Sequence, residues 1–154
     1  MIVTMTAKCS ALDVAKYILK KHGQMTAMKL QKLVYYCQAW SLVWDERPMF
    51  REKIKAWANG PVVPALFHAL KGHFQVVSRD LQTGDVSSLD EKARETADAV
   101  FKFYGDKTAQ WLSDLTHAEQ PWIEARGGLC AGESGGNEIP IARMDEYYGS
   151  LKKN

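Results

Sequence analysis

Apolar residues recur at helical spacing from residue 11 onward. Through residue 19 they follow one face of a helix, and Ser10 stands directly before them in the N-cap position. Asp13 lies three residues later, where the acid of a capping box belongs, and Gly23 is suited to end a helix. The pattern therefore predicts a first helix that begins after Ser10 and ends at Gly23.

A longer helical pattern starts at Thr26 and continues to Trp44. Its main apolar stripe has a second stripe beside it, and together they comprise Leu30, Leu33, Val34, Cys37, Ser41 and Trp44, with Tyr36, Trp40 and Val43. An apolar surface this wide predicts a central, mostly buried helix, with Lys29 and Lys32 off its main stripe. On this helix Cys37 is expected to be a small core residue.

Between 45 and 60 the pattern fits two structures. Apolar spacings of four and three favour a short helix, whereas the alternation over 54–58 favours a strand, so both remain open. Asn59-Gly60-Pro61 then forms a sharp break. Pro61 is well placed to open the next helix, which we expect over 61–71.

Two short runs farther along the chain predict a small β-hairpin. Residues 74–78 are typical of a strand, and residues 81–86 hold turn residues and a short return strand. Three capping signals then predict further helices, opened by Ser88 with Glu91, by Asp106, and by Thr116 with Glu119.

A glycine-rich segment separates these helices from a last one. Five of the ten residues at 127–136 are glycine, which predicts a flexible loop, and helical spacing returns over 140–151. We find no internal repeat and no domain linker. The chain is therefore predicted to be mainly α, a compact single-domain helical bundle with a small β-hairpin. The domain would span 1–154, with a core over about 11–126 plus the C-terminal helix 140–151.

Composition narrows the class of protein. Of the 154 residues, 46% are hydrophobic and 25% are charged, which is average for a soluble globular protein. No apolar run approaches the roughly 20 residues that cross a bilayer, and the N-terminus lacks a secretory signal, so we expect a cytoplasmic protein with no membrane partner. The three cysteines and four histidines match no zinc or redox spacing, and no metal or cofactor is expected.

Charge is distributed unevenly along the chain. Residues 1–60 carry ten Lys and Arg against four Asp and Glu, a net charge of +6, and the remainder carries −4. A basic half can meet nucleic acid or an acidic protein face, or can be a solvated helix surface. A winged-helix reader of DNA would need Arg, Asn or Gln on its recognition helix, and 61–71 offers only Lys71 as a base. Sequence-specific binding of nucleic acid is therefore disfavoured.

Two segments match catalytic patterns without the context that catalysis needs. Residues 132–136 fit Gly-x-Ser-x-Gly around Ser134, but no strand precedes them, and Gly-Lys-Ser/Thr of a phosphate loop is missing. His117 and Glu119 form a polar cluster that could carry acid–base work, but Thr116 and Glu119 are better explained as helix caps. We predict a mobile glycine loop, a helix junction and no enzymatic activity.

Aromatic residues exceed what one small core usually needs. The chain has five Trp, six Tyr and five Phe. Because Trp and Tyr are enriched among the energetic anchors of protein interfaces, this surplus favours a protein-binding surface.

Three segments in fixed order carry a family resemblance. The first is the helical segment 28–40, and the other two hold scattered motif residues: Phe50, Glu52, Ile54, Ala56-Trp57 and Gly60-Pro61-Val62-Val63-Pro64, then Leu112-Ser113, Thr116-His117, Glu119, Pro121-Trp122 and Ala125-Arg126. Together they resemble the Panacea domain, also called SocA-like, which is common in phage-associated proteins. The resemblance extends from about Ala11 to Arg126.

The resemblance implies a mainly helical antitoxin without enzymatic activity. Family members neutralise a toxin encoded beside them, usually by direct protein–protein binding. One branch acts instead as a proteolytic adaptor that delivers its toxin to an AAA+ protease. A nucleic-acid-binding phage or prophage regulator is a further alternative, and a homodimer is also open.

Contact with a toxin is expected at six residues, chosen for their charge or aromatic character: Lys29, Lys32, Tyr36, Trp57, Pro61 and Trp122. The apolar pattern alone would assign Tyr36 and Trp57 to the core. The basic half of the chain suggests an acidic toxin face, or mimicry of a basic partner.

Overall fold

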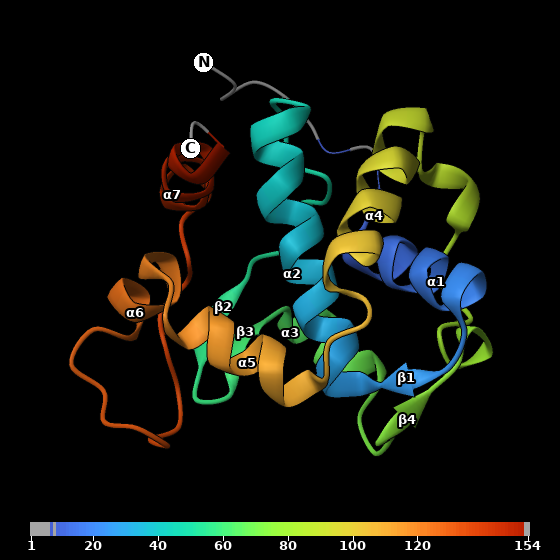
Figure 1. The fold of residues 1–154 in the computed structure, drawn as a ribbon. Helices are drawn as coiled ribbons and strands as arrows, with labels where there is room; N and C mark the ends of the chain where they lie inside the picture. Colours follow the sequence, from blue (N-terminus) through green and yellow to red (C-terminus); the bar gives the residue numbers. More distant parts are fainter. Residues whose placement is uncertain (1–6, 8, 153–154) are drawn as a thin grey trace.

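In the computed structural model, which describes residues 7 and 9–152, helix α2 (Ala27–Trp44) runs through the middle of the molecule (Figure 1). Six further helices of this described part surround it: α1 (Ala11–His22), α3 (Pro64–Ala69), α4 (Glu91–Tyr104), α5 (Ala109–His117), α6 (Gln120–Arg126) and α7 (Ile141–Lys152). The mainly helical fold that the sequence predicted is confirmed.

The first two helices begin at the residues that the sequence indicated. The Ser10 hydroxyl accepts a hydrogen bond from the Asp13 N–H at 3.2 Å, and the Asp13 carboxylate accepts one from the Ser10 N–H at 2.9 Å. The Thr26 hydroxyl accepts from the Lys29 N–H at 3.0 Å. Gly23, with φ of +90°, ends α1. These local signals predicted the helix ends correctly because each involves residues only three or four positions apart.

Helix α2 is central because its surface is covered on nearly every side. All ten residues from Leu30 to Ala39 are buried, and Cys37 is fully so. Lys32 had been placed off the main apolar stripe, yet only 1% of its surface is exposed. Gly60, distant in sequence, packs against its side chain, since an added Cβ there would come within 2.6 Å of Lys32 Cε and 3.0 Å of Thr116 Oγ1. The amphipathic pattern of one helix could not reveal this cover.

The segment whose pattern fitted both a helix and a strand forms a β-hairpin. Strand β2 (Lys55–Trp57) pairs antiparallel with β3 (Gly60–Val62). Gly60 has φ of +120°, a conformation that residues with a side chain rarely adopt, and it begins the return strand. Pro61 therefore lies in a strand, and the expectation that it opens a helix is wrong. Pro64 opens α3 instead.

The hairpin predicted within residues 74–86 is wrong. Strand β4 (Gln75–Val76) pairs with β1 (Met25–Thr26), which directly precedes α2. The residues after β4 form short 3-10 turns in place of a return strand. Asp13 on α1 holds the end of this segment, because its carboxylate accepts hydrogen bonds from the Asp85 N–H at 2.7 Å and from the Ser88 hydroxyl at 2.8 Å.

Helices α4 and α5 begin two residues later than their capping signals indicated. The carboxylate of Asp90, rather than Ser88, caps α4. The hydroxyl of Thr108, rather than Asp106, caps α5. Both neighbouring positions carry good capping residues, and Ser88 is engaged with Asp13.

Two buried glutamines of α2 form hydrogen bonds with backbone groups of the chain that flanks the β2–β3 hairpin. Gln38 accepts hydrogen bonds at Oε1 from the N–H groups of Met49 (2.7 Å) and Phe50 (3.1 Å), and its Nε2 donates to the Phe50 carbonyl at 2.8 Å. Gln31 accepts from the Val63 N–H at 2.9 Å and donates to the Val63 carbonyl at 3.2 Å. The chain between these points, which contains the β2–β3 hairpin, is thereby fixed to α2 at both ends.

Helix α7 is the C-terminal helix that the sequence predicted, and a buried carboxylate ties it to the centre. Oε1 of Glu119 accepts hydrogen bonds from the hydroxyls of Tyr148 on α7 (2.6 Å) and Tyr36 on α2 (2.8 Å). The Tyr35 and Tyr148 hydroxyls lie 3.0 Å apart. Glu119 therefore forms no side-chain cap, and the prediction that it caps a helix with Thr116 is wrong.

Candidate functional site

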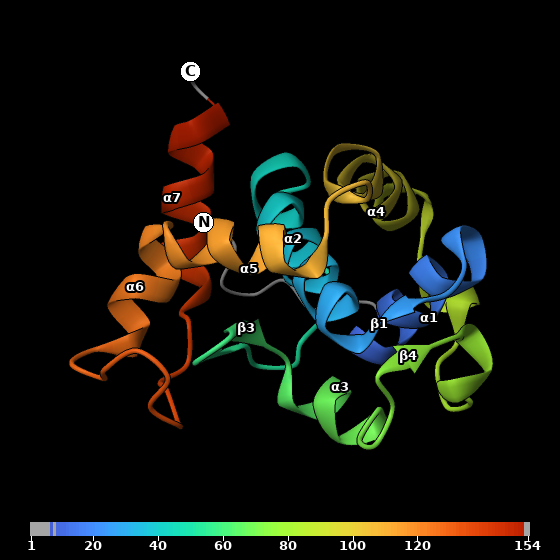
Figure 2. The same ribbon diagram turned by 60° about the horizontal axis from the view of Figure 1, so that its bottom comes forward.

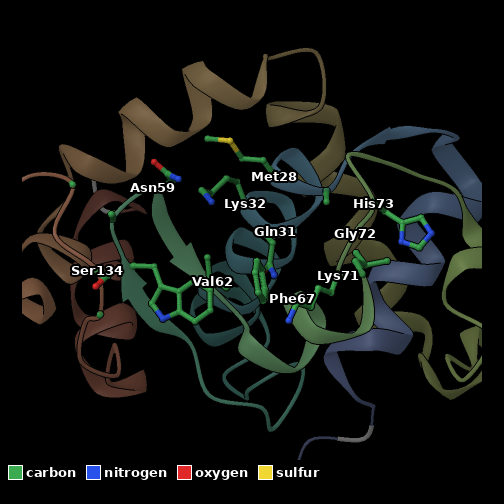
Figure 3. A pocket seen from close by; sticks show the side chains of 16 residues that line it. Met28, Gln31, Lys32, Asn59, Val62, Phe67, Lys71, Gly72, His73 and Ser134 are labelled. Atoms are coloured by element: carbon green, nitrogen blue, oxygen red, sulfur yellow. The ribbon is translucent and has the colours of Figure 1, made fainter.

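A cavity of about 440 Å³ opens beside α2, among residues of the β2–β3 hairpin, α3 and the segment between α6 and α7. Figure 2 shows these three parts along one side of α2, and Figure 3 shows the cavity from close by. Helix α2 and each of these parts contribute to the lining, for example Lys32, Trp57, Phe67 and Ser134. The cavity thus depends on segments that are far apart in the sequence.

Lys32 supplies the buried charge of this cavity. Its side chain extends from α2 toward Asn59 (Figure 3) and packs against Gly60, where an added Cβ would come within 2.6 Å of the Lys32 Cε atom. Among the described residues, no hydrogen-bond or ion-pair partner meets its ammonium group. Burial lowers the pKa of Lys32 from its ordinary 10.5 to about 8.

The other lining residues are apolar or basic. Trp57 and Phe67 form an edge-to-face pair with ring centroids 5.1 Å apart, so one wall of the cavity is aromatic. Lys71 and His73 are exposed at the α3 end, and no aspartate or glutamate lies among the lining residues. Asp80 is nearby, with its carboxylate 3.6 Å from His73 Nε2. The inner wall at Lys32 therefore has no compensating acid.

We expect Lys32→Met to stabilise the fold. At pH 7 the buried ammonium costs about 3 kcal/mol, because its pKa of about 8 in the folded chain lies below the unfolded value of 10.5. Between pH 8 and 10.5 the folded chain loses this proton while the unfolded chain keeps it, so the cost fades as pH rises. Urea unfolding from pH 7 to 10.5 should show a gain that shrinks toward zero.

Lys102→Met is the matched control, since Lys102 is exposed on α4 and outside the cavity lining. Its unfolding free energy should stay within about 0.5 kcal/mol of the unmodified chain. A gain for Lys32→Met that is equal at every pH would contradict the buried-charge explanation.

A second hollow, of about 410 Å³, adjoins the first along Ala58, Asn59 and Gly132. His117 and Trp122 stack on its wall with ring centroids 4.0 Å apart. His117 Nε2 is buried without a hydrogen-bond partner among the described atoms. Burial, and next the charge of Lys32, lower the pKa of His117 below 6.5, so this ring is neutral at pH 7.

Arg126, at the end of α6, shapes the glycine-rich segment that borders both hollows. Its guanidinium donates to the carbonyls of Gly135 (2.7 Å), Glu133 (2.8 Å) and Cys130 (3.1 Å), and also to the Ala56 carbonyl in β2 (3.1 Å). The segment contains no helix or strand, as predicted. The prediction of a mobile loop missed that one buried cation gathers its backbone, because only the glycine content was visible in the sequence.

The six residues predicted to contact a partner fall in three places. Three border the hollows, namely Lys32, Trp57 and Trp122. Pro61 and Tyr36 are buried, the first in the hairpin and the second in the core. Lys29 lies elsewhere, with its ammonium donating to the Gly105 carbonyl after α4. Their contact with a partner stays a prediction. The sequence analysis did not single out Phe67, Lys71 and His73, which line the first cavity with Lys32 and Trp57.

The chemistry of this region suits binding. Ser134 borders the cavity, but no histidine or carboxylate of the described chain hydrogen-bonds to it, so its hydroxyl lacks an activating base. The same described residues contain no group of three His, Cys, Asp or Glu that could hold a metal ion. Cys9, Cys37 and Cys130 are free thiols. None of the described helices is both long and apolar enough to span a membrane.

Comparison with known proteins identifies the family. No curated protein matches the chain, and no solved structure matches it. The family model described as "Antitoxin SocA-like, Panacea domain" matches residues 30–123, which is more than half of the chain. The matched region starts inside α2 and includes Lys32, the β2–β3 hairpin, α3 and Trp122. This chain therefore belongs to the SocA-like Panacea antitoxin family.

Proposed function

We propose that this protein is an antitoxin that neutralises a cognate toxin by direct protein–protein binding. The match to the antitoxin family over residues 30–123 is the observation that carries this proposal. The form of the region beside α2 supports it, because a preformed cavity with an aromatic wall and a buried charge suits recognition of one partner.

We place the toxin on the face that contains the two hollows. Trp57 and Trp122 lie on this face, and the Trp122 Nε1–H donates to the Trp57 carbonyl at 2.8 Å, so the two parts of the face are held together. Phe67, which lines the first hollow and packs on Trp57, is 42% exposed. A contiguous apolar patch left in water is typical of a surface that becomes covered by a partner.

Coexpression with the protein encoded beside this chain tests the proposal. We expect that protein to arrest growth when expressed alone, to be harmless in the presence of this chain, and to copurify with it at fixed stoichiometry. Growth curves and size-exclusion chromatography with light scattering give the two measurements, and the chromatography of this chain alone also tests for a homodimer.

Two other outcomes separate the alternatives. Rescue of growth without a stable complex, together with a fall in the toxin level that requires an AAA+ protease, would replace the binding mechanism by a proteolytic adaptor. Failure of both rescue and binding would contradict the antitoxin proposal. DNA binding that weakens steeply as salt rises would then support a nucleic-acid-binding regulator.

A further inference from the structure

The Lys32 ammonium is a buried cation that the described chain leaves without a partner. It is only 1% exposed and makes no hydrogen bond or ion pair with any described residue. Buried charges in proteins are normally paired, because removing a charge from water is costly. Since Lys32 lines a cavity that opens to the surface, an anion that enters the cavity can supply the missing partner.

The cavity also limits what kind of anion fits. Its volume of about 440 Å³ exceeds that of a single amino-acid side chain, so it can take two neighbouring side chains of a docked segment. Trp57, Phe67 and Val62 offer apolar contact in the lining, and Lys71 adds positive charge at the α3 end (Figure 3). A complementary segment therefore carries a carboxylate next to an apolar side chain.

We propose that this cavity receives an acidic anchor of the toxin, in which an Asp or Glu carboxylate pairs with the Lys32 ammonium and an adjacent apolar side chain packs against Trp57 and Phe67. This inference rests on the proposed antitoxin function and specifies how the partner is recognised. The anchor is buried on binding, as are the residues that dominate the energetics of protein interfaces.

Proton uptake should accompany binding. The titratable side chains that line the two hollows with Lys32 are Lys71, His73, His117, Arg126 and Cys130, and none of them is a carboxylate. The neighbouring carboxylates are Asp80, which lies 3.6 Å from His73 Nε2, and Asp114, which acts on His117. Near pH 8 the Lys32 amine is partly neutral, whereas a bound carboxylate favours the charged form. Affinity should therefore fall as pH rises, to about one tenth at pH 9 of its value at pH 7.

Binding of the neighbouring-gene protein to Lys32→Met and Lys102→Met tests the anchor. We expect Lys32→Met to weaken binding by at least about 30-fold and to remove the pH dependence, since pairing with a buried charge is lost. Lys102→Met removes the same charge from an exposed site on α4 and should bind within twofold of the unmodified chain. Isothermal titration calorimetry at pH 7, 8 and 9 measures both effects, and thermal unfolding shows that each variant is folded.

The outcomes separate this inference from the proposed function. If the unmodified chain binds the neighbouring protein and Lys32→Met binds it equally well, the acidic anchor is wrong while the antitoxin function stands. Strong binding of acetate or inorganic phosphate to the unmodified chain, with toxin binding unchanged in Lys32→Met, would assign the cavity to a free small anion and also overturn the anchor. If the unmodified chain does not bind the neighbouring protein at all, the proposed function itself fails.

Discussion

A chain carrying Glu119→Ala is expected to lose at least about 1–3 kcal/mol of unfolding free energy, because the Tyr36 hydroxyl would remain buried without its acceptor and the Tyr148 hydroxyl would keep only its contact with the Tyr35 hydroxyl. Both hydroxyls donate to the same carboxylate oxygen, and Tyr148, which like Met144 of α7 is fully buried, also joins α7 to α2 through the Tyr35 hydroxyl. The loss should therefore be accompanied by faster hydrogen exchange in α7, which mass spectrometry measures directly.

Glu119→Gln is the matched variant, since it keeps one oxygen that can accept both hydroxyls and replaces the other, with its charge, by an uncharged NH2 group. Burial raises the pKa of Glu119 above its ordinary 4.5, although the hydroxyls of Tyr148 and Tyr36 partly oppose the shift. Because the pKa of this carboxyl is raised in the folded chain, the unfolding free energy falls as pH rises from 4.5 through the folded pKa. Glu119→Gln should lack this part of the pH dependence. Equal destabilisation by Ala and Gln would contradict the acceptor role.

The same experiment tests the domain organisation. We propose that residues 1–154 form one folding unit, with α7 joined to the core through Tyr148. In that case Glu119→Ala shifts a single unfolding transition for probes in both α2 and α7. Separate transitions for α7 and for the rest of the chain would show instead that α7 is an independent appendage.

Gln38→Ala should cost at least about 3 kcal/mol, because it leaves three buried backbone groups of Met49 and Phe50 without partners. Gln31→Ala removes two such bonds, both to Val63, and should cost less. Gln24 is exposed and pairs only with the exposed Gln75, so Gln24→Ala should change stability by less than about 0.5 kcal/mol. Urea unfolding of the three variants measures the series.

The order of the three effects is the critical result. If Gln31→Ala and Gln38→Ala lower the unfolding free energy as little as Gln24→Ala, water replaces the amide groups and the glutamines do not fix the hairpin segment. If the expected order holds, hydrogen exchange at residues 49–63 should rise most in Gln38→Ala.

The sequence predicted what short-range signals specify. Ser10 with Asp13 and Thr26 mark helix starts correctly because capping depends on residues within one turn. Ser88 and Asp106 misled because another capping residue stands two positions later and a distant carboxylate, Asp13, engages Ser88. Local chemistry alone does not choose between neighbouring caps.

The candidate site was less predictable because distant segments build it. Trp57 and Trp122 were expected at a surface from their residue type, and both border the hollows. Lys32 was chosen as a basic residue off the main apolar stripe, yet it is buried, because segments distant in sequence, such as the one at Gly60, pack against it. The pairing of β1 with β4 likewise joins residues about fifty positions apart, which no local pattern contains.

The Arg126 guanidinium donates its hydrogen bonds in the glycine-rich segment to backbone carbonyls, and this has an evolutionary consequence. Every amino acid offers the same carbonyl, so replacement of the side chains at Leu129, Ala131 or Ser134 leaves those hydrogen bonds intact. These side chains border the hollows where we place the toxin. Relatives could therefore differ in sequence at these positions and bind a different toxin, while the backbone of the segment keeps the same conformation.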